Sequence, residues 1–277
     1  MRRGSAWIRW IVIGLMLLWS LFPIYWAVNT SFMTNGAAQS TPAHWLPVPG
    51  TLSNYTQALG AGTVSSQVVR SLLNSTVEAV GTTAATIVIA VLGGYAFARL
   101  RFRFRRVLFY TVLATLALPG LATLIALYKM ASYVHLDNTY LGIILVYTSG
   151  AIPLGMWIMH NAFNAIPVTL EEAAWIDGAG RFRTFRTIAL PLARTGVAAA
   201  GIITFLFSWS QFTFPLVLSN GITTEPVTVL LPALVATRQV AFTLENSVAV
   251  LAILIPVGLV LVLNRWIVSG LLAGGVK

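Results

Sequence analysis

The chain has no cysteine and very few charged residues. Of its 277 residues, 57% are hydrophobic and only 9% are Asp, Glu, Lys or Arg, whereas a soluble domain carries about 25% charged residues. The absence of cysteine excludes disulfides, thiolate metal sites and cysteine nucleophiles. So few charges could not cover the surface of a soluble fold, and we therefore expect most of the chain to lie in lipid.

Several motifs of enzymes are also missing. No GxxxxGK[ST] segment occurs, and the only lysines are Lys129 and Lys277, whereas a P-loop needs its glycine loop and lysine together to hold phosphates. HExxH, GxSxG and clustered carboxylates are absent, and His44, His135 and His160 are scattered along the chain. We therefore expect a protein that is not an enzyme and that binds no metal or cofactor itself.

Long apolar runs take the place of the missing charges. A helix needs about 20 mostly apolar residues to cross the hydrocarbon core, and a charge at its centre would cost roughly 2.5–3.5 kcal/mol. The first run is too long for a signal peptide and lacks a convincing cleavage site after Trp26, so we expect it to be retained. The predicted fold is an all-α integral membrane domain over residues 1–277, with spans at about 7–28, 71–98, 107–128, 138–159, 196–218 and 246–266.

The basic residues give the orientation. The net charge is +10, and a basic chain could bind nucleic acid, but here the basic residues lie between the apolar runs. Three of the 17 Lys and Arg residues, Arg70, Lys129 and Arg238, fall on one side of the predicted bundle. The other 14 are Arg2, Arg3, Arg9, Arg99, Arg101, Arg103, Arg105, Arg106, Arg181, Arg183, Arg186, Arg194, Arg265 and Lys277. The positive-inside rule then predicts that both termini are cytoplasmic.

Four features outside the cytoplasmic loops stand out. The long outside loop, 29–69, is rich in turn-forming residues, but 54–59 could form a short helix, and 220–245 could dip into the membrane as a broken helix. Gly93 and Gly94 would allow close helix packing. Glu78 is either a functional intramembrane acid or, as we expect from its position near the interface, a hydrated or Arg70-paired carboxylate.

The loop between the fourth and fifth spans, 160–195, is too polar to cross the membrane and too patterned to be a plain linker. Thr169 and Glu172 fit a capping box, and acidic residues suit the positive end of a helix dipole. Gly178 permits a sharp turn after this first helix, and a second short helix is expected over 181–189, ending before Pro191. The pattern predicts a helix–turn–helix that projects from the bilayer.

This loop resembles a known family. The segments Glu172-Ala173-Ala174, Asp177-Gly178-Ala179 and Ile188-Ala189-Leu190-Pro191 are similar, in sequence and spacing, to the "EAA" loop of binding-protein-dependent ABC importer permeases. The resemblance implies a type I importer fold in which the loop forms a coupling helix that sits in a groove of the ATPase subunit. The residues it assigns to this contact are Glu171, Glu172, Ala173, Ala174, Asp177, Gly178 and Ala179.

Other segments are similar to the carbohydrate branch of that family, in particular to the second permease subunit of maltose-type systems. They are 70–75 before the second span, 95–100 at its exit, and the glycine-rich tail 270–277. Around residues 209–212 the chain reads Trp-Ser-Gln-Phe and departs from the family's Trp-Asn-acid/aromatic pattern. Candidate pathway residues that could contact a sugar are Asn74, Tyr147, Trp209 and Gln211, which could equally be packing residues.

The resemblance implies a full set of partners. They are a homologous permease subunit, an ATPase dimer that carries ATP and Mg²⁺, an extracytoplasmic solute-binding protein and the lipid of the cell membrane. The expected function is to form, with the partner permease, the membrane pathway for a sugar or similar polar solute. Other polar nutrients, such as a glycerophosphodiester, remain open as solutes. The alternatives from other classes are a secondary transporter or channel, which charge-free midplanes disfavour, and a membrane scaffold without transport.

Overall fold

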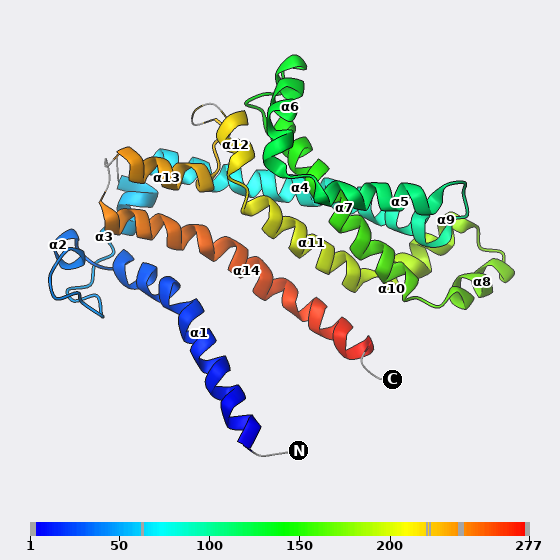
Figure 1. Ribbon diagram of the computed structural model, residues 1–277, viewed down its shortest axis with the longest axis horizontal. Helices are drawn as coiled ribbons and strands as arrows, with labels where there is room; N and C mark the ends of the chain where they lie inside the picture. The colour runs from blue at the N-terminus through cyan, green and yellow to red at the C-terminus, as the bar shows by residue number, and fades with distance from the viewer. Residues whose placement is uncertain (1–3, 62–63, 220, 222, 238–240, 275–277) are drawn as a thin grey trace. The chain divides into compact units, whose positions relative to one another are not determined.

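The computed structural model describes residues 4–61, 64–219, 221, 223–237 and 241–274, and this part of the chain is helical (Figure 1). The helices are α1 (Gly4–Ser31), α2 (Asn35–Ala38), α3 (Ser53–Thr56), α4 (Ser65–Arg99), α5 (Arg105–Ala114), α6 (Gly120–Tyr133), α7 (Tyr140–Asn164), α8 (Val168–Ile176), α9 (Arg181–Thr184), α10 (Leu190–Leu192), α11 (Arg194–Trp209), α12 (Thr213–Leu218), α13 (Val227–Thr237) and α14 (Phe242–Gly274). A 3₁₀ turn covers Thr115–Ala117, and π-helical turns cover Gln57–Ala61 and Phe185–Ala189. Arg2, Arg3, Arg238 and Lys277, used above for orientation, and residues 275–277 of the glycine-rich tail lie outside the described residues.

Four of the described helices are long and apolar enough to cross a membrane, and two bent helix pairs could each serve as one further span. The four are Trp7–Ser31, Ser65–Arg99, Tyr140–Asn164 and Phe242–Val262. The bent pairs are Arg105–Ala117 with Gly120–Tyr133 and Arg181–Leu192 with Arg194–Trp209. The upper count of six agrees with the number of apolar runs in the sequence.

The third predicted span is not one continuous helix. Its two halves are bent by 102° at Leu118 and Pro119. Leu118 has an extended backbone with ψ 123°, and Pro119 stands before the first residue of α6. The bend arises because a proline disfavours the helical conformation in the residue before it. The fifth predicted span is likewise divided, since α11 ends at Trp209 and α12 begins at Thr213.

The chain divides into two compact units. The first unit comprises Met1–Arg70 and Leu230–Leu254, and the second comprises Ser71–Val229 and Ile255–Lys277. In the first unit Asn54 ties the outside loop together, because its buried amide nitrogen donates to the carbonyl oxygens of Ser31 (2.8 Å) and Met33 (2.9 Å). The Thr243 hydroxyl, near the start of α14, donates to the Asn54 side-chain oxygen at 3.1 Å. The expected short helix at 54–59 is confirmed as α3 with its following π turn.

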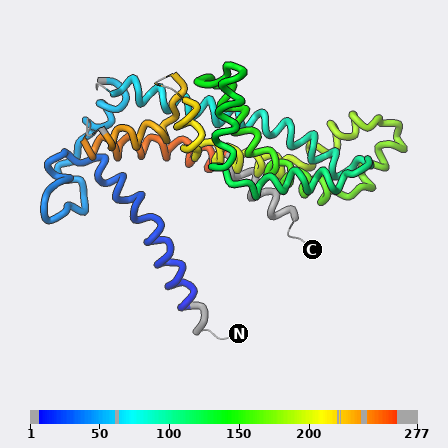
Figure 2. The backbone as a smooth tube through the Cα atoms, turned by 45° about the horizontal axis from the view of Figure 1, so that its top comes forward, coloured from blue at the N-terminus to red at the C-terminus, as the bar shows by residue number. Residues whose placement is uncertain are grey.

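In the second unit α4, α7 and α11 lie side by side, and α8–α10 turn back beyond the ends of α4 and α7 (Figure 2). The close packing expected at Gly93 and Gly94 is present. A Cβ atom added to Gly94 would lie 2.7 Å from the Cβ of Met159 and 2.9 Å from the backbone nitrogen of His160. The absence of a side chain at Gly94 therefore sets the distance between α4 and α7 at this end.

Candidate functional site

The first helix of the patterned loop, α8, begins two residues earlier than the capping box requires. Pro167 precedes the helix, Val168 is its first residue, and no side-chain hydrogen bond caps it. The expected capping box of Thr169 and Glu172 is therefore wrong. Pro167 explains the difference, because a residue with a fixed φ and no N–H can start a helix without a side-chain cap.

Glu171, in the first turn of α8, is fully buried and holds α8 to the end of α4. The Arg99 Nε donates to Glu171 Oε1 at 2.5 Å, and the Tyr95 hydroxyl donates to Glu171 Oε2 at 2.9 Å. The Arg99 Nη2 also donates to the carbonyl oxygen of Ile166 at 2.7 Å. The Arg99 side chain is 8% exposed, so both charges of the pair are removed from solvent and each has its partner. We call Tyr95, Arg99 and Glu171 the latch.

The turn after α8 is a Schellman motif. The backbone N–H of Ala179 donates to the Ala174 carbonyl at 2.9 Å, and that of Gly178 donates to the Trp175 carbonyl at 3.1 Å. Gly178 has φ +82°, a conformation that glycine adopts at little cost. The sharp turn that the sequence predicts is thus present, and it fixes the direction in which the chain enters α9.

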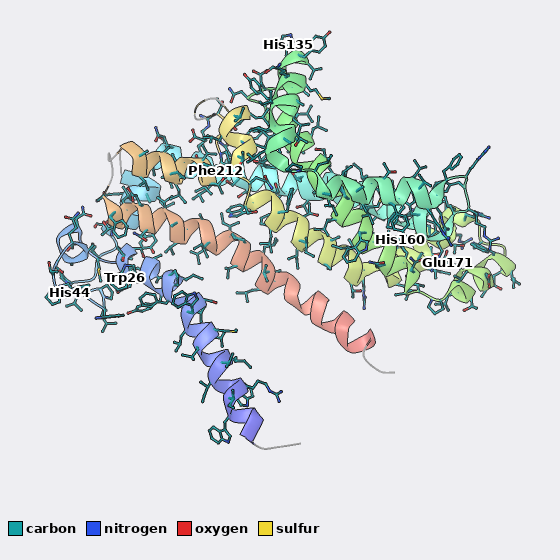
Figure 3. All side chains as sticks on the ribbon, in the orientation of Figure 1. Trp26, His44, His135, His160, Glu171 and Phe212 are labelled. Carbon is teal, nitrogen blue, oxygen red and sulfur yellow. The ribbon has the colours of Figure 1, made fainter. Side chains whose placement is uncertain are left out.

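The far side of α8 and its turn is exposed. Glu172, Ala173, Asp177 and Gly178 are exposed, and Ala174 and Ala179 are half-buried. Two large apolar side chains lie beside them, with Ile176 87% and Phe182 74% exposed. Exposed apolar groups of this size next to charged ones are typical of a protein contact surface. We call these eight residues the exposed loop face. Glu171, which was grouped with them from sequence, is buried and belongs to the latch; Figure 3 labels its position.

The second arm of the loop is longer than predicted. α9, the π turn at Phe185–Ala189 and α10 follow one another without a break through Pro191 to Leu192. The expected end before Pro191 is wrong, because Pro191 lies at the start of α10, where its missing N–H is tolerated. Phe185 packs against Tyr95, with ring centroids 4.7 Å apart, so this arm also contacts the end of α4.

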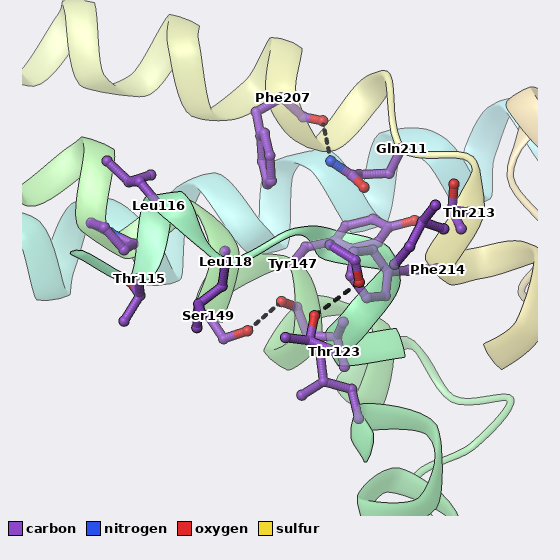
Figure 4. Close-up of a pocket in the computed structure, with 16 residues that line it drawn as sticks. Thr115, Leu116, Leu118, Thr123, Tyr147, Ser149, Phe207, Gln211, Thr213 and Phe214 are labelled. Atoms are coloured by element: carbon purple, nitrogen blue, oxygen red, sulfur yellow. Dashed lines mark hydrogen bonds between the residues drawn. The ribbon is translucent and has the colours of Figure 1, made fainter. Parts of the chain in front are cut away.

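A cavity of about 650 Å³ opens in the second unit among the 3₁₀ turn, α6, α7, α11 and α12 (Figure 4). Aromatic rings and small polar groups line it together. Its aromatic residues are Tyr147, Phe207 and Phe214; its polar residues are Thr115, Thr123, Ser149, Gln211 and Thr213. A mixed lining of this kind can stack on an apolar face of a ligand and hydrogen-bond its polar groups.

The structure separates the four pathway candidates into two groups. Tyr147 and Gln211 both line the cavity, and the Gln211 Nε2 donates to the Phe207 carbonyl at 3.2 Å. Trp209 is buried and stacks on Phe205, so it packs within the bundle. Asn74 is fully buried, and its side-chain nitrogen donates to the carbonyl oxygen of Glu225 at 3.0 Å. The Tyr147 and Gln211 positions therefore fit a pathway, and the other two fit structural roles.

Asn74 fastens α4 to the loop before α13. The Tyr140 hydroxyl donates to its side-chain oxygen at 2.6 Å, and the neighbouring Ser75 hydroxyl accepts from the backbone N–H of Val227 at 2.9 Å. Burial raises the pKa of the Glu225 carboxyl above its ordinary value. These bonds give Asn74 and Ser75, in the segment 70–75 before the second predicted span, a structural role.

Glu78 is buried, and among the described residues it forms no salt bridge with Arg70. It is 1% exposed, its Oε1 atom has no hydrogen-bond partner among the described residues, and its carboxyl faces the Tyr147 hydroxyl. The one salt bridge of the described residues is that of Arg99 with Glu171. The expectation of a surface-like carboxylate was wrong because α4 already begins at Ser65, so that Glu78 lies inside the helix, close to Gly81, where α7 packs against it.

Sequence reasoning did not find Arg99 as a partner of the loop. The sequence contained the information needed, because Arg99 lies at the end of the second predicted span and Glu171 near the start of the loop helix, on the same predicted side of the membrane.

In the described part of the chain no group of three or more His, Asp and Glu side chains could hold a metal ion.

The comparison with protein families decides what this arrangement belongs to. Residues 86–271, which include the latch, the loop and the cavity-lining part of α7 and α11, match the model of the "binding-protein-dependent transport system inner membrane component". The chain belongs to this family. It is therefore a transport permease.

Named relatives agree over nearly the whole length. The chain is 32% identical to the sulfoquinovosyl glycerol transport system permease of Agrobacterium fabrum, over 98% of this chain and 93% of the relative. It is 35% identical to the sn-glycerol-3-phosphate transport system permease of the same organism, over 94% of this chain and 93% of the relative. Among solved structures, a bacterial ABC transporter that imports the acidic polysaccharide alginate has the same fold, with a TM-score of 0.81, 21% identity, and coverage of 96% of this chain and 98% of that one.

Proposed function

We propose that this permease forms, with a homologous partner, the membrane pathway of an ATP-driven importer, and that α8 and its turn dock on a separate ATPase subunit. The exposed loop face carries this proposal. Docking would bury Ile176 and Phe182, which are 87% and 74% exposed in this structure. Removing their apolar surface from water would stabilise the complex by about 25 cal/mol per Å².

The latch connects the docked helix α8 to the membrane-spanning helix α4. Glu171 joins α8 to Arg99 and Tyr95, the last turns of α4, through a buried salt bridge and a hydrogen bond. Phe185 of the second arm packs on the same tyrosine. A displacement of α8 by a closing ATPase would therefore move the end of α4 with it. Moving a two-state permease in this way requires that ATP binding stabilise one state over the other.

The cavity supplies a place for the solute. Tyr147, Phe207 and Phe214 offer ring faces, and the amide of Gln211 and four hydroxyl groups offer hydrogen bonds. This chemistry suits a sugar or a similar polar solute delivered by an extracytoplasmic binding protein. A glycerol phosphate ester is the second candidate, because a relative 35% identical is named for sn-glycerol-3-phosphate transport.

The coupling role is tested by reversing one charge on the exposed loop face. Glu172→Lys should abolish or strongly reduce uptake and weaken co-purification with the ATPase, while the permease still reaches the membrane. Asp137→Lys is the matched control, because Asp137 is also an exposed acid but lies in the turn between α6 and α7. Normal uptake and normal ATPase association in Glu172→Lys would refute the docking assignment.

A further inference from the structure

Buried polar atoms without hydrogen-bond partners gather on the packed faces of three helices. Glu78 and Thr82 are four residues apart and so share one face of α4. Tyr147 and Thr148 lie on α7, and Ser208 lies near the end of α11. In the part of the chain that the structure describes, each of these five side chains has one buried polar atom without a hydrogen-bond partner. We call the five residues the polar junction.

The polar junction draws on three helices that pack against one another. The Glu78 carboxyl and the Tyr147 hydroxyl face each other across the α4–α7 contact, without a hydrogen bond of ordinary geometry. The two helices are close at this level, since a Cβ atom on Gly81 would lie 2.5 Å from the Ile144 side chain. The end of α11 joins them, because a Cβ atom on Gly150 would lie 3.3 Å from the Phe207 ring.

An unsatisfied polar group in a protein interior is expensive. Burial removes its hydrogen bonds to water without replacing them, and the large majority of buried polar atoms in native proteins are hydrogen-bonded. An ionisable side chain within a membrane span is costlier still and marks a functional site by default. Several such groups at one helix junction therefore indicate that another molecule satisfies them during the protein's work.

The neighbouring cavity indicates what kind of molecule this is. Tyr147 belongs both to the polar junction and to the cavity lining, which joins the two. None of the 16 residues that line the cavity is Arg, Lys or His. Lys129 is on α6, but it is exposed and lies two positions from the lining residue Leu127, a spacing at which helical side chains do not share a face.

Among the described residues that line the cavity, a solute with a phosphate or sulfonate group would meet no Arg, Lys or His side chain. Proteins bind such groups with Arg or Lys, through charge-assisted hydrogen bonds, and an unpaired anion in an apolar cavity is strongly disfavoured. An ionised Glu78 would repel the anion, and a protonated one would not attract it. Hydroxyl groups, in contrast, can donate to the Glu78 carboxyl and exchange hydrogen bonds with Tyr147 and Thr148.

We infer that the polar junction and the adjoining cavity bind the hydroxyl groups of an uncharged sugar or polyol, with Glu78 as a binding residue for the solute. This inference rests on the proposed function and narrows its solute to a neutral class. The permease then differs in selectivity from its relative that is named for sn-glycerol-3-phosphate, although the fold is shared.

The test uses the complete transporter in proteoliposomes and matched solutes that differ in charge. Solute-stimulated ATP turnover is measured with a panel of neutral glycosides and polyols and with their phosphorylated or sulfonated counterparts. At least one neutral compound should stimulate turnover, and its charged counterpart should be at least tenfold less effective. Binding of both to the solubilised permease and ATPase complex, without the binding protein, separates the preference of the permease from that of the binding protein.

Variants of the polar junction give the second arm. Glu78→Leu should raise the KM for the neutral solute at least tenfold, as expected when a hydrogen bond to a carboxyl is lost. Glu78→Gln, which keeps hydrogen-bonding atoms, should restore most of the affinity. Thr86→Val is the control. Thr86 also lies on α4 and has a buried hydroxyl without a hydrogen-bond partner, but it packs against Gly155, outside the polar junction. The KM of this variant should stay within about twofold of that of the unmodified protein.

The outcomes distinguish the inference from the function on which it rests. Equal stimulation by a charged solute and its neutral counterpart, or an unchanged KM in Glu78→Leu, overturns the inference and leaves the importer intact. If the permease does not assemble with an ATPase at all, the proposed function fails, and the inference fails with it.

Discussion

The latch between α8 and α4 makes the most quantitative prediction. Glu171 is fully buried and Arg99 is 8% exposed, and removing one member of a buried ion pair typically costs about 3–5 kcal/mol, because the other charge is left unpaired. Arg99→Met should lower the free energy of unfolding by about this amount. Glu171→Gln keeps the shape of the side chain and the Tyr95 contact, so its cost should be smaller, about 1.5–3 kcal/mol.

The double variant separates a true pair from two independent losses. Combining Arg99→Met with Glu171→Gln removes both charges, so the total loss should be about 2 kcal/mol smaller than the sum of the two single losses. The assay is denaturant unfolding of the purified permease in mixed micelles, followed in parallel by uptake in cells. Losses that add within about 0.5 kcal/mol would show that the two groups are not coupled, which would contradict the latch.

Three further predictions test the packing and the turns. Gly94→Leu should destabilise the protein by about 1–3 kcal/mol, because the new side chain meets Met159 and the backbone beside it; Gly14→Leu, which meets no atom within 4 Å, should leave the unfolding free energy nearly unchanged. Gly178→Val should cost about 1–2 kcal/mol, since φ is +82°, and should reduce uptake more than it reduces the amount of permease in the membrane. Asn54→Ala should cost about 2–3 kcal/mol by leaving two buried carbonyl groups unpaired, measured as a shift of the unfolding midpoint.

Much of the helical framework could be predicted from the sequence, because membrane helices follow from the length and charge of apolar runs. The runs near residues 7–28, 71–98, 138–159 and 246–266 are each part of a long helix. The 102° bend at Pro119 could not be predicted, since a proline in an apolar run can leave a mild kink or divide the span. Whether Pro119 leaves a mild kink or divides the span depends on how α6 and α12 pack against each other, and the sequence does not specify this packing.

The sequence predicted the motif of the candidate site, but it did not predict the contacts that the residues of this motif make. Gly178 was correctly expected at a turn, because few other residues adopt a positive φ without cost. Glu171 and Glu172 are neighbours of the same type, and no local pattern shows that one is buried against Arg99 while the other is exposed. The roles of Asn74 and Glu78 depended in the same way on long-range partners, Glu225 and Tyr147, whose proximity follows only from helix packing.

The absence of cysteine makes one measurement especially direct. Ile176→Cys would place a single thiol on the exposed loop face, and Trp45→Cys would place one in the outside loop, where Trp45 is 63% exposed. In the assembled transporter, a short thiol-to-amine cross-linker should join Ile176→Cys to the ATPase subunit and should leave Trp45→Cys unlinked to it. Cross-linking of the ATPase to Trp45→Cys, or its absence from Ile176→Cys in an assembled and active complex, would contradict the docking of α8 on the ATPase.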